Sequence, residues 1–134
     1  MGEKREKFNF ENLSVYQKSL LYIDFVYKAT AKFPNEERFG LASQFRRAVQ
    51  SIALNIGEGS GGSNAEFKQF IRISRRSVRE CIVCTTIAKM KRYITEEQEN
   101  KSRDMCLELS KMLSGLLSSL KRLQTPSSKL LTPN

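Results

Sequence analysis

Residues that break helices are confined to short stretches of this chain, and this distribution most constrains how it can fold. Five of the seven glycines lie between positions 40 and 62, and only three prolines occur in 134 residues. Glycine and proline are the residues that helix interiors tolerate least. In the long segments that remain, apolar residues recur at spacings of three and four, which indicates helices, and no segment alternates as a strand does.

Four helices follow from this pattern, with breaks at Phe33-Pro34, in the glycine-rich run 57–62 and near residue 93. A capping box, in which two side chains satisfy free backbone N–H groups, marks a helix start. Three pairs fit this pattern: Ser14 with Gln17, Ser63 with Glu66 and Thr95 with Gln98. Asn35 is a suitable N-cap for the second helix.

Short connections make consecutive helices antiparallel neighbours. We therefore predict an all-α, antiparallel up-down-up-down four-helix bundle over residues 13–124. A lead-in, 1–12, precedes it, and a flexible tail, 125–134, follows it. A chain of this length can bury a core without disulfides or metal.

The first helix has apolar residues on more than one face. Its predicted core face consists of Leu13, Tyr16, Leu20, Ile23 and Tyr27. Other apolar side chains stand outside the predicted core faces of the first and third helices: Tyr22, Phe25, Val26, Ile71, Val78, Ile82 and Val83. We interpret this surplus as burial against other subunits of a homo-oligomer. A larger core within one chain is the alternative.

The chain is strongly basic, with a net charge of +9. Such an excess attracts nucleic acid, anionic membranes or acidic protein surfaces, or it serves solubility alone. The charged N-terminal segment does not resemble a signal peptide, and no apolar run is long enough to cross a bilayer. The chain has three cysteines, and an odd number without a secretory signal indicates a reducing compartment. Together these features predict a cytoplasmic protein with no membrane association.

The third helix carries most of the excess charge. Residues 63–93 hold eight Lys or Arg against two Glu. Lys68, Arg72, Arg75 and Arg79 are spaced four, three and four, so they form one stripe, with Arg76 on its flank. Such a stripe is a candidate contact for nucleic-acid phosphates. The alternatives are a solvated helix face, or pairing with acidic groups of a partner subunit.

No motif indicates catalysis, a cofactor or a metal site. The chain has no histidine, the commonest general base, and Cys81 and Cys84 lack the further ligands of a closed zinc site. We predict that these cysteines are buried in the core. The glycine-rich run 57–62 matches a dinucleotide fingerprint only formally, because a helix precedes it where a strand is required. We therefore predict a protein that is not an enzyme.

The second helix carries a polar stripe on a surface that otherwise packs, formed by Arg47, Ser51, Asn55 and Glu58. Arg47 and Glu58 are three turns apart, so their partners must lie on another helix or another subunit. We interpret the stripe as a structural polar network, and a binding site is the alternative.

The second helix also resembles a known family. The residues that carry the resemblance are Phe33-Pro34, Glu37, Phe39-Gly40-Leu41, Gln44, Arg46-Arg47-Ala48, Ser51-Ile52 and Asn55-Ile56-Gly57-Glu58-Gly59. They are similar to the signature of a bacterial four-helix-bundle family. That family includes the proteins encoded within intervening sequences of 23S ribosomal RNA genes.

The resemblance implies a bundle that assembles as a pentameric ring and has no assigned enzymatic activity. It also implies a relation to the accessory protein of diversity-generating retroelements, which binds nucleic acid and a reverse transcriptase. Our leading hypothesis is a basic, homopentameric bundle that binds RNA or DNA through the third helix. The alternative is a protein-interaction scaffold, or an accessory subunit of a nucleic-acid enzyme such as a reverse transcriptase.

Overall fold

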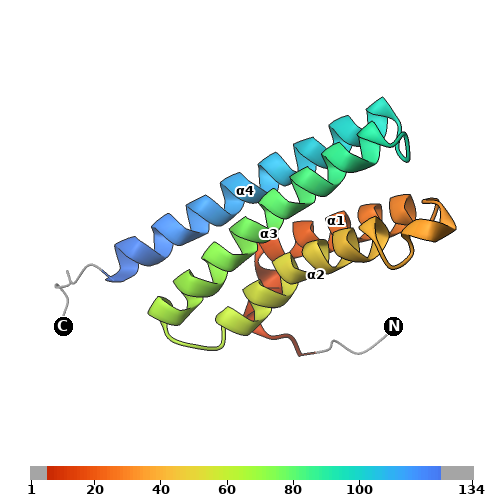
Figure 1. Cartoon of the computed structure of the whole chain (residues 1–134). Helices are drawn as coiled ribbons and strands as arrows, with labels where there is room; N and C mark the ends of the chain where they lie inside the picture. Colours follow the sequence, from red (N-terminus) through yellow and green to blue (C-terminus); the bar gives the residue numbers. More distant parts are fainter. Residues whose placement is uncertain (1–5, 125–134) are drawn as a thin grey trace, which may run out of the picture.

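The computed structural model describes residues 6–124 and shows an all-helical protein, with no strand in that range (Figure 1). Its α-helices are α1 (Ser14–Thr30), α2 (Leu41–Gly59), α3 (Asn64–Met90) and α4 (Glu96–Gln124). Two short 3-10 helices, η1 (Asn9–Asn12) and η2 (Asn35–Glu37), precede α1 and α2. The predicted tail, 125–134, and the first five residues of the predicted lead-in lie outside the described residues. The prediction of four helices and no strands is confirmed.

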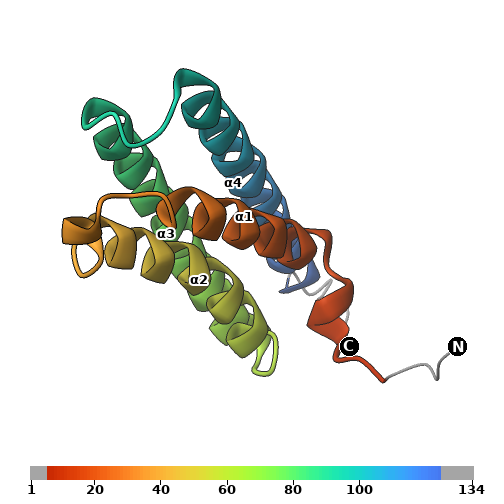
Figure 2. The ribbon, with the colours of Figure 1, turned by 90° about the vertical axis from the view of Figure 1, so that its right-hand side faces the viewer.

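The four helices pack as a bundle. The backbone of α1 lies against α2, α2 against α3, α3 against α4, and α4 again against α1. The α2–α3 turn lies at one end of the molecule, and the α1–α2 and α3–α4 connections lie towards the other (Figure 1). Figure 2 shows α1 beside both α2 and α4. None of the described helices is both long enough and apolar enough to span a membrane.

Two of the three predicted capping boxes are confirmed. The Ser63 hydroxyl accepts a hydrogen bond from the Glu66 N–H at 3.2 Å, and the Glu66 carboxylate accepts from the Ser63 N–H at 2.8 Å. Thr95 and Gln98 form the same pair of bonds at the start of α4. The predicted box at Ser14 is wrong, because the Gln17 side-chain amide donates instead to a carbonyl of η1.

The start of α2 also differs from the prediction. Asn35 begins η2 and does not cap α2. Instead the Glu37 carboxylate accepts hydrogen bonds from the Leu41 N–H at 2.9 Å and from the Tyr93 hydroxyl at 2.8 Å. Both bonds hold the pKa of Glu37 below its ordinary value, and the bond from the Leu41 N–H contributes more than the bond from the Tyr93 hydroxyl. One carboxylate therefore ties the first turn of α2 to the connection between α3 and α4.

The buried face of α1 is not the predicted one. Its buried residues are Val15, Ser19, Tyr22, Val26, Ala29 and Thr30. Four of them lie one position before a residue of the predicted face, which corresponds to a rotation of about 100°. Both faces satisfy the helical spacing, so periodicity could not choose between them. The structure buries the face where the hydroxyl groups find partners.

The predicted surplus of apolar residues is mostly core. Tyr22, Val26, Ile71 and Val78 are buried within the chain itself. Phe25 and Ile82 are partly buried against the same core, whereas Val83 is exposed. Our interpretation that these side chains are buried between subunits is therefore wrong for the first four. The alternative, a larger core within one chain, accounts for them.

Close contact between α2 and α3 explains the glycine-rich run. A Cβ atom at Gly59 would lie 2.5 Å from the Cβ of Phe70, so only glycine fits there. The Phe10 ring covers Gly57 in a similar way, at 3.3 Å from where its Cβ would stand. The run ends one helix and leads into the next, as predicted, and the Ser74 hydroxyl adds a hydrogen bond to the Ile52 carbonyl of α2.

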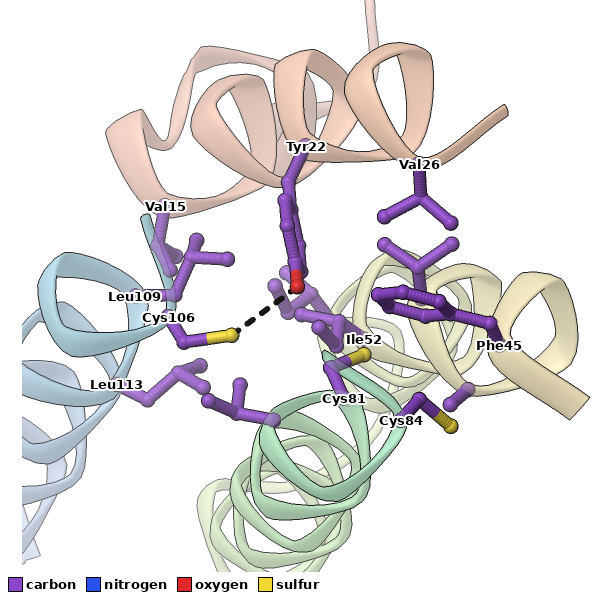
Figure 3. Close-up of a cluster of buried hydrophobic side chains, with 14 of the residues drawn as sticks. Val15, Tyr22, Val26, Phe45, Ile52, Cys81, Cys84, Cys106, Leu109 and Leu113 are labelled. Atoms are coloured by element: carbon purple, nitrogen blue, oxygen red, sulfur yellow. Dashed lines mark hydrogen bonds between the residues drawn. The ribbon is translucent and has the colours of Figure 1, made fainter. Parts of the chain in front are cut away.

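A chain of hydrogen bonds crosses the centre of the bundle. The Thr85 hydroxyl donates to the Cys81 carbonyl, so the Ser102 hydroxyl must donate to Thr85 and the Tyr22 hydroxyl to Ser102. The Cys106 thiol donates in turn to the Tyr22 oxygen at 3.2 Å (Figure 3). Tyr22 thus links α1 to α4 through a satisfied polar group. Burial raises the pKa of its hydroxyl well above the ordinary value.

Candidate nucleic-acid interface

The α3 helix has a buried face and a basic outer face. Its buried residues are Ile71, Ser74, Ser77, Val78, Cys81, Cys84, Thr85 and Ala88. At about 100° per residue, the predicted stripe lies on the opposite side. Arg76 and Arg79 are exposed, and Lys68, Arg72 and Arg75 are half-buried. The five basic side chains therefore extend over about three turns of the solvent-facing side.

No carboxylate within the described part of the chain neutralises the arginines of this stripe. Two ion pairs of the described residues, Lys18–Glu108 and Lys28–Asp24, involve none of these arginines. Arg72 donates to the neutral side chain of Gln69 at 3.3 Å, and Lys68 is engaged in an interaction within the chain. The guanidinium charges of the stripe are thus available to an external anion.

The outer face of α3 changes character after Arg79. Val83 is 55% exposed and Met90 is 74% exposed, and Ile87 is also on the surface. Val83 and Ile87 line a hollow of about 400 Å³ together with Phe39, from the loop before α2. A basic half and an apolar half therefore adjoin on one helix face.

The four residues of the predicted polar network on α2 are only partly brought together. The Asn55 amide donates to the Ser51 carbonyl at 2.7 Å and to the Ser51 hydroxyl at 2.9 Å. The Ser77 hydroxyl of α3 donates to the Ser51 oxygen at 2.9 Å. The side chains of Arg47 and Glu58 are exposed, and neither forms a hydrogen bond or an ion pair within residues 6–124. The network therefore consists of two residues of α2 and one of α3.

The three cysteines are buried, as predicted for Cys81 and Cys84. Burial raises the pKa of Cys84 and of Cys106 to about 11 and raises that of Cys81 further. The thiols therefore stay protonated near neutral pH, where a thiolate would be needed for metal binding or nucleophilic attack. Within residues 6–124, no group of three or more metal-ligating side chains of the His, Cys, Asp and Glu types comes together.

The sequence interpretation did not single out Arg38 and Arg46 as site residues. With Arg47 they line a cavity of about 470 Å³ between the end of α1 and the start of α2. A signal was present, because three arginines and an aromatic residue lie within ten positions. The three arginines come together around one cavity because of the way α1 and α2 pack. Spacing along the sequence does not predict this packing.

A comparison with protein families identifies the group to which this fold and sequence belong. A profile of the 23S rRNA-intervening sequence protein family matches residues 11–115. The chain belongs to this family. The matched region covers α1 to α3 and the larger part of α4. The predicted membership is confirmed, and the predicted relation to the retroelement accessory protein stays a prediction.

One solved structure extends the comparison. A protein with unknown function from the S23 ribosomal protein family of Bacteroides thetaiotaomicron is 25% identical in sequence, with a TM-score of 0.72. The similarity covers 78% of this chain and 95% of that one. A comparison with curated proteins gives no significant match.

Proposed function

We propose that the protein binds the phosphate backbone of RNA or DNA through the outer face of α3 and catalyses no reaction. The observation that carries this proposal is the set of unneutralised arginines: Arg72, Arg75, Arg76 and Arg79 form no ion pair within residues 6–124. Guanidinium groups match phosphate geometry with two parallel hydrogen bonds. Backbone contacts position a protein without reading bases, so we expect little sequence preference.

We further propose that the functional unit is a homopentameric ring of antiparallel up-down-up-down bundles. The resemblance to the intervening-sequence family supports this assembly. The short connections at alternating ends of the molecule support the helix order (Figure 1). Exposed apolar side chains such as Leu20 and Leu54, which line a groove between α1 and α2, offer surface for subunit contacts.

The decisive experiment measures binding of a labelled structured RNA and a DNA duplex over a salt series. A variant with glutamine at all four arginines, R72Q/R75Q/R76Q/R79Q, keeps most of each side chain and loses its charge. For the duplex, we expect a log–log salt slope that is shallower by about 0.9 for each lost phosphate contact, with weaker binding at every salt concentration. Native mass spectrometry of both proteins checks that five copies of the 15.4 kDa chain remain assembled.

A charge-matched control separates a specific surface from net charge. Lys7, Lys32, Arg103 and Lys111 are exposed and lie outside α3, and their replacement by glutamine also removes four positive charges. We expect this control variant to keep the wild-type slope to within about one contact. Equal losses in the two variants, or no binding by the wild type at low salt, would refute the proposal.

A protein-interaction scaffold is the second candidate function. The observation that favours it is the exposed apolar half of the same helix face, with Val83, Ile87 and Met90. A partner with an apolar patch beside acidic groups would contact both halves of this face. In that case the protein would be an accessory subunit, and its partner would be a nucleic-acid enzyme such as a reverse transcriptase. If the wild type does not bind nucleic acid, this function becomes the preferred one.

A further inference from the structure

The cavity at the start of α2 has the size and charge of a binding site for a small anion. Its volume of about 470 Å³ falls within the range of small-molecule sites. Arg38, Arg46 and Arg47 line it, and no carboxylate does. The acidic residue nearest in sequence to Arg38 is Glu37, whose carboxylate is bonded to the Leu41 N–H and the Tyr93 hydroxyl.

Arg46 is held in place before any ligand arrives. Its Nε donates to the Thr30 hydroxyl at 2.8 Å, and one Nη donates to the Tyr27 carbonyl at 3.4 Å. Its guanidinium also lies over the Tyr27 ring, 4.5 Å from the ring centroid. Two of five N–H donors are used in this way, and three remain. A guanidinium that is already fixed loses little conformational entropy on binding an anion.

The other two arginines have their donors free. The side chains of Arg38 and Arg47 are exposed, and neither forms a hydrogen bond or an ion pair within residues 6–124. The guanidinium of Arg38 lies 5.5 Å from the centre of the Phe39 ring. Three guanidinium groups around one hollow suit a phosphate, whose several oxygens accept hydrogen bonds from planar forks.

Phe39 adds the second part of the site. Its side chain is 89% exposed and lines the same cavity. An exposed aromatic ring beside arginines is the arrangement on which proteins stack unpaired bases.

We propose that this cavity binds a nucleotide, with its phosphate held by Arg46 and Arg47 and its base stacked on Phe39 near Arg38. A free nucleotide and a nucleotide within a single strand share this chemistry. This site is separate from the proposed α3 interface, because residues of α1, of α2 and of the connection between them line it. The glycine-rich run 57–62 takes no part in it.

Calorimetric titration of the wild type with adenosine 5′-monophosphate, adenosine and inorganic phosphate tests the proposal. We expect the nucleotide to bind more tightly than either fragment by about tenfold or more. The variant R38Q/R47Q should weaken nucleotide binding by at least about tenfold. The variant F39L should weaken it by about fivefold or more and leave phosphate binding unchanged. Circular dichroism checks that both variants fold.

Two controls separate this cavity from the α3 stripe. The variant R103Q/K111Q removes the same number of charges from exposed positions outside the cavity and outside the stripe, and it should bind the nucleotide like the wild type. The stripe variant R72Q/R75Q/R76Q/R79Q should also keep nucleotide binding. Loss of duplex binding by the stripe variant therefore reports on the proposed function, and loss of nucleotide binding by R38Q/R47Q reports on the cavity.

Competition experiments identify the source of the nucleotide. A short single-stranded oligoadenylate that binds more tightly than the free nucleotide, and is displaced by it, supports a nucleotide within a strand. Binding of the free nucleotide alone supports a small-molecule ligand. The proposal fails if millimolar nucleotide does not bind, if R38Q/R47Q binds like the control, or if an oligoglutamate of similar charge competes equally well.

Discussion

Tyr22 is fully buried, and its hydroxyl stands at the junction of three helices. It donates to Ser102 at 2.7 Å. It also accepts from the Cys106 thiol at 3.2 Å (Figure 3). Ser102 passes the chain on to Thr85 at 2.8 Å. Hydrogen bonds in such a chain strengthen one another in a low dielectric, and they leave no buried group unpaired.

We expect Tyr22→Phe to lower the free energy of unfolding by about 1–3 kcal/mol, because Cys106 loses its acceptor and Ser102 loses its donor. Urea unfolding followed by circular dichroism measures this. Tyr16→Phe is the matched control, since Tyr16 is half-buried and its hydroxyl has no hydrogen-bond partner within residues 6–124. Equal effects of the two substitutions would show that the central chain of bonds adds no stability.

The role of Tyr22 could not be predicted from the sequence. Its partner Ser102 lies 80 positions away, and Thr85 lies on a third helix. Local spacing gives no information on such contacts. Periodicity therefore placed Tyr22 outside the predicted core face of the first helix. In the structure Tyr22 is buried, and its hydroxyl has hydrogen-bond partners on α4.

At the scale of the elements, the contact between α2 and α3 depends on the absence of a side chain at Gly59. Gly59→Ala brings a Cβ to 2.5 Å from that of Phe70, and both atoms are fixed to helix backbones. We expect a loss of about 1–3 kcal/mol in the free energy of unfolding, although alanine favours the helix. Thermal or urea unfolding provides the measurement.

Gly115→Ala is the control for this substitution. A Cβ at Gly115, in α4, meets no atom within 4 Å. Alanine should therefore stabilise the protein by about 0.5–1 kcal/mol through helix propensity alone. Opposite signs at the two glycines support close packing as the cause. Stabilisation at both would mean that α3 moves away at little cost.

Helix starts show which elements the sequence could predict. The Ser63 and Thr95 boxes close within three residues, so their residue types alone predicted them. The start of α2 depends on Glu37, which also bonds to Tyr93 across 56 positions. The arginine cavity has the same origin, because it forms where two helices and a loop meet. Contacts between residues far apart in the sequence cannot be predicted from the spacing of residues within one helix.

At the scale of the whole molecule, the buried thiols make stability depend on alkaline pH. Cys84 and Cys106 have pKa values of about 11 in the fold, against an ordinary value of 9.0. The unfolded chain therefore loses these protons first as the pH rises. The stability that the protonated thiols contribute is complete below pH 9 and is lost as the pH rises towards 11.

We expect the free energy of unfolding to fall steadily from pH 9 to pH 11, as measured by urea unfolding at several pH values. Cys84→Ala and Cys106→Ala should each be less stable at neutral pH, because they leave a small void. Each should nevertheless lose less stability over the alkaline range, because one titrating group is gone. An unchanged slope in both variants would assign the alkaline loss to other groups.

The central hydroxyl chain also has a consequence for the order of folding during synthesis. Helices α1, α2 and α3 pack against their neighbours in sequence, so these contacts can form as the chain leaves the ribosome. The contact between α1 and α4 has to wait for the last described helix. Until then Tyr22 lacks Ser102 and Cys106, the two partners that α4 supplies. The nascent chain therefore carries an incomplete centre that closes only when α4 arrives.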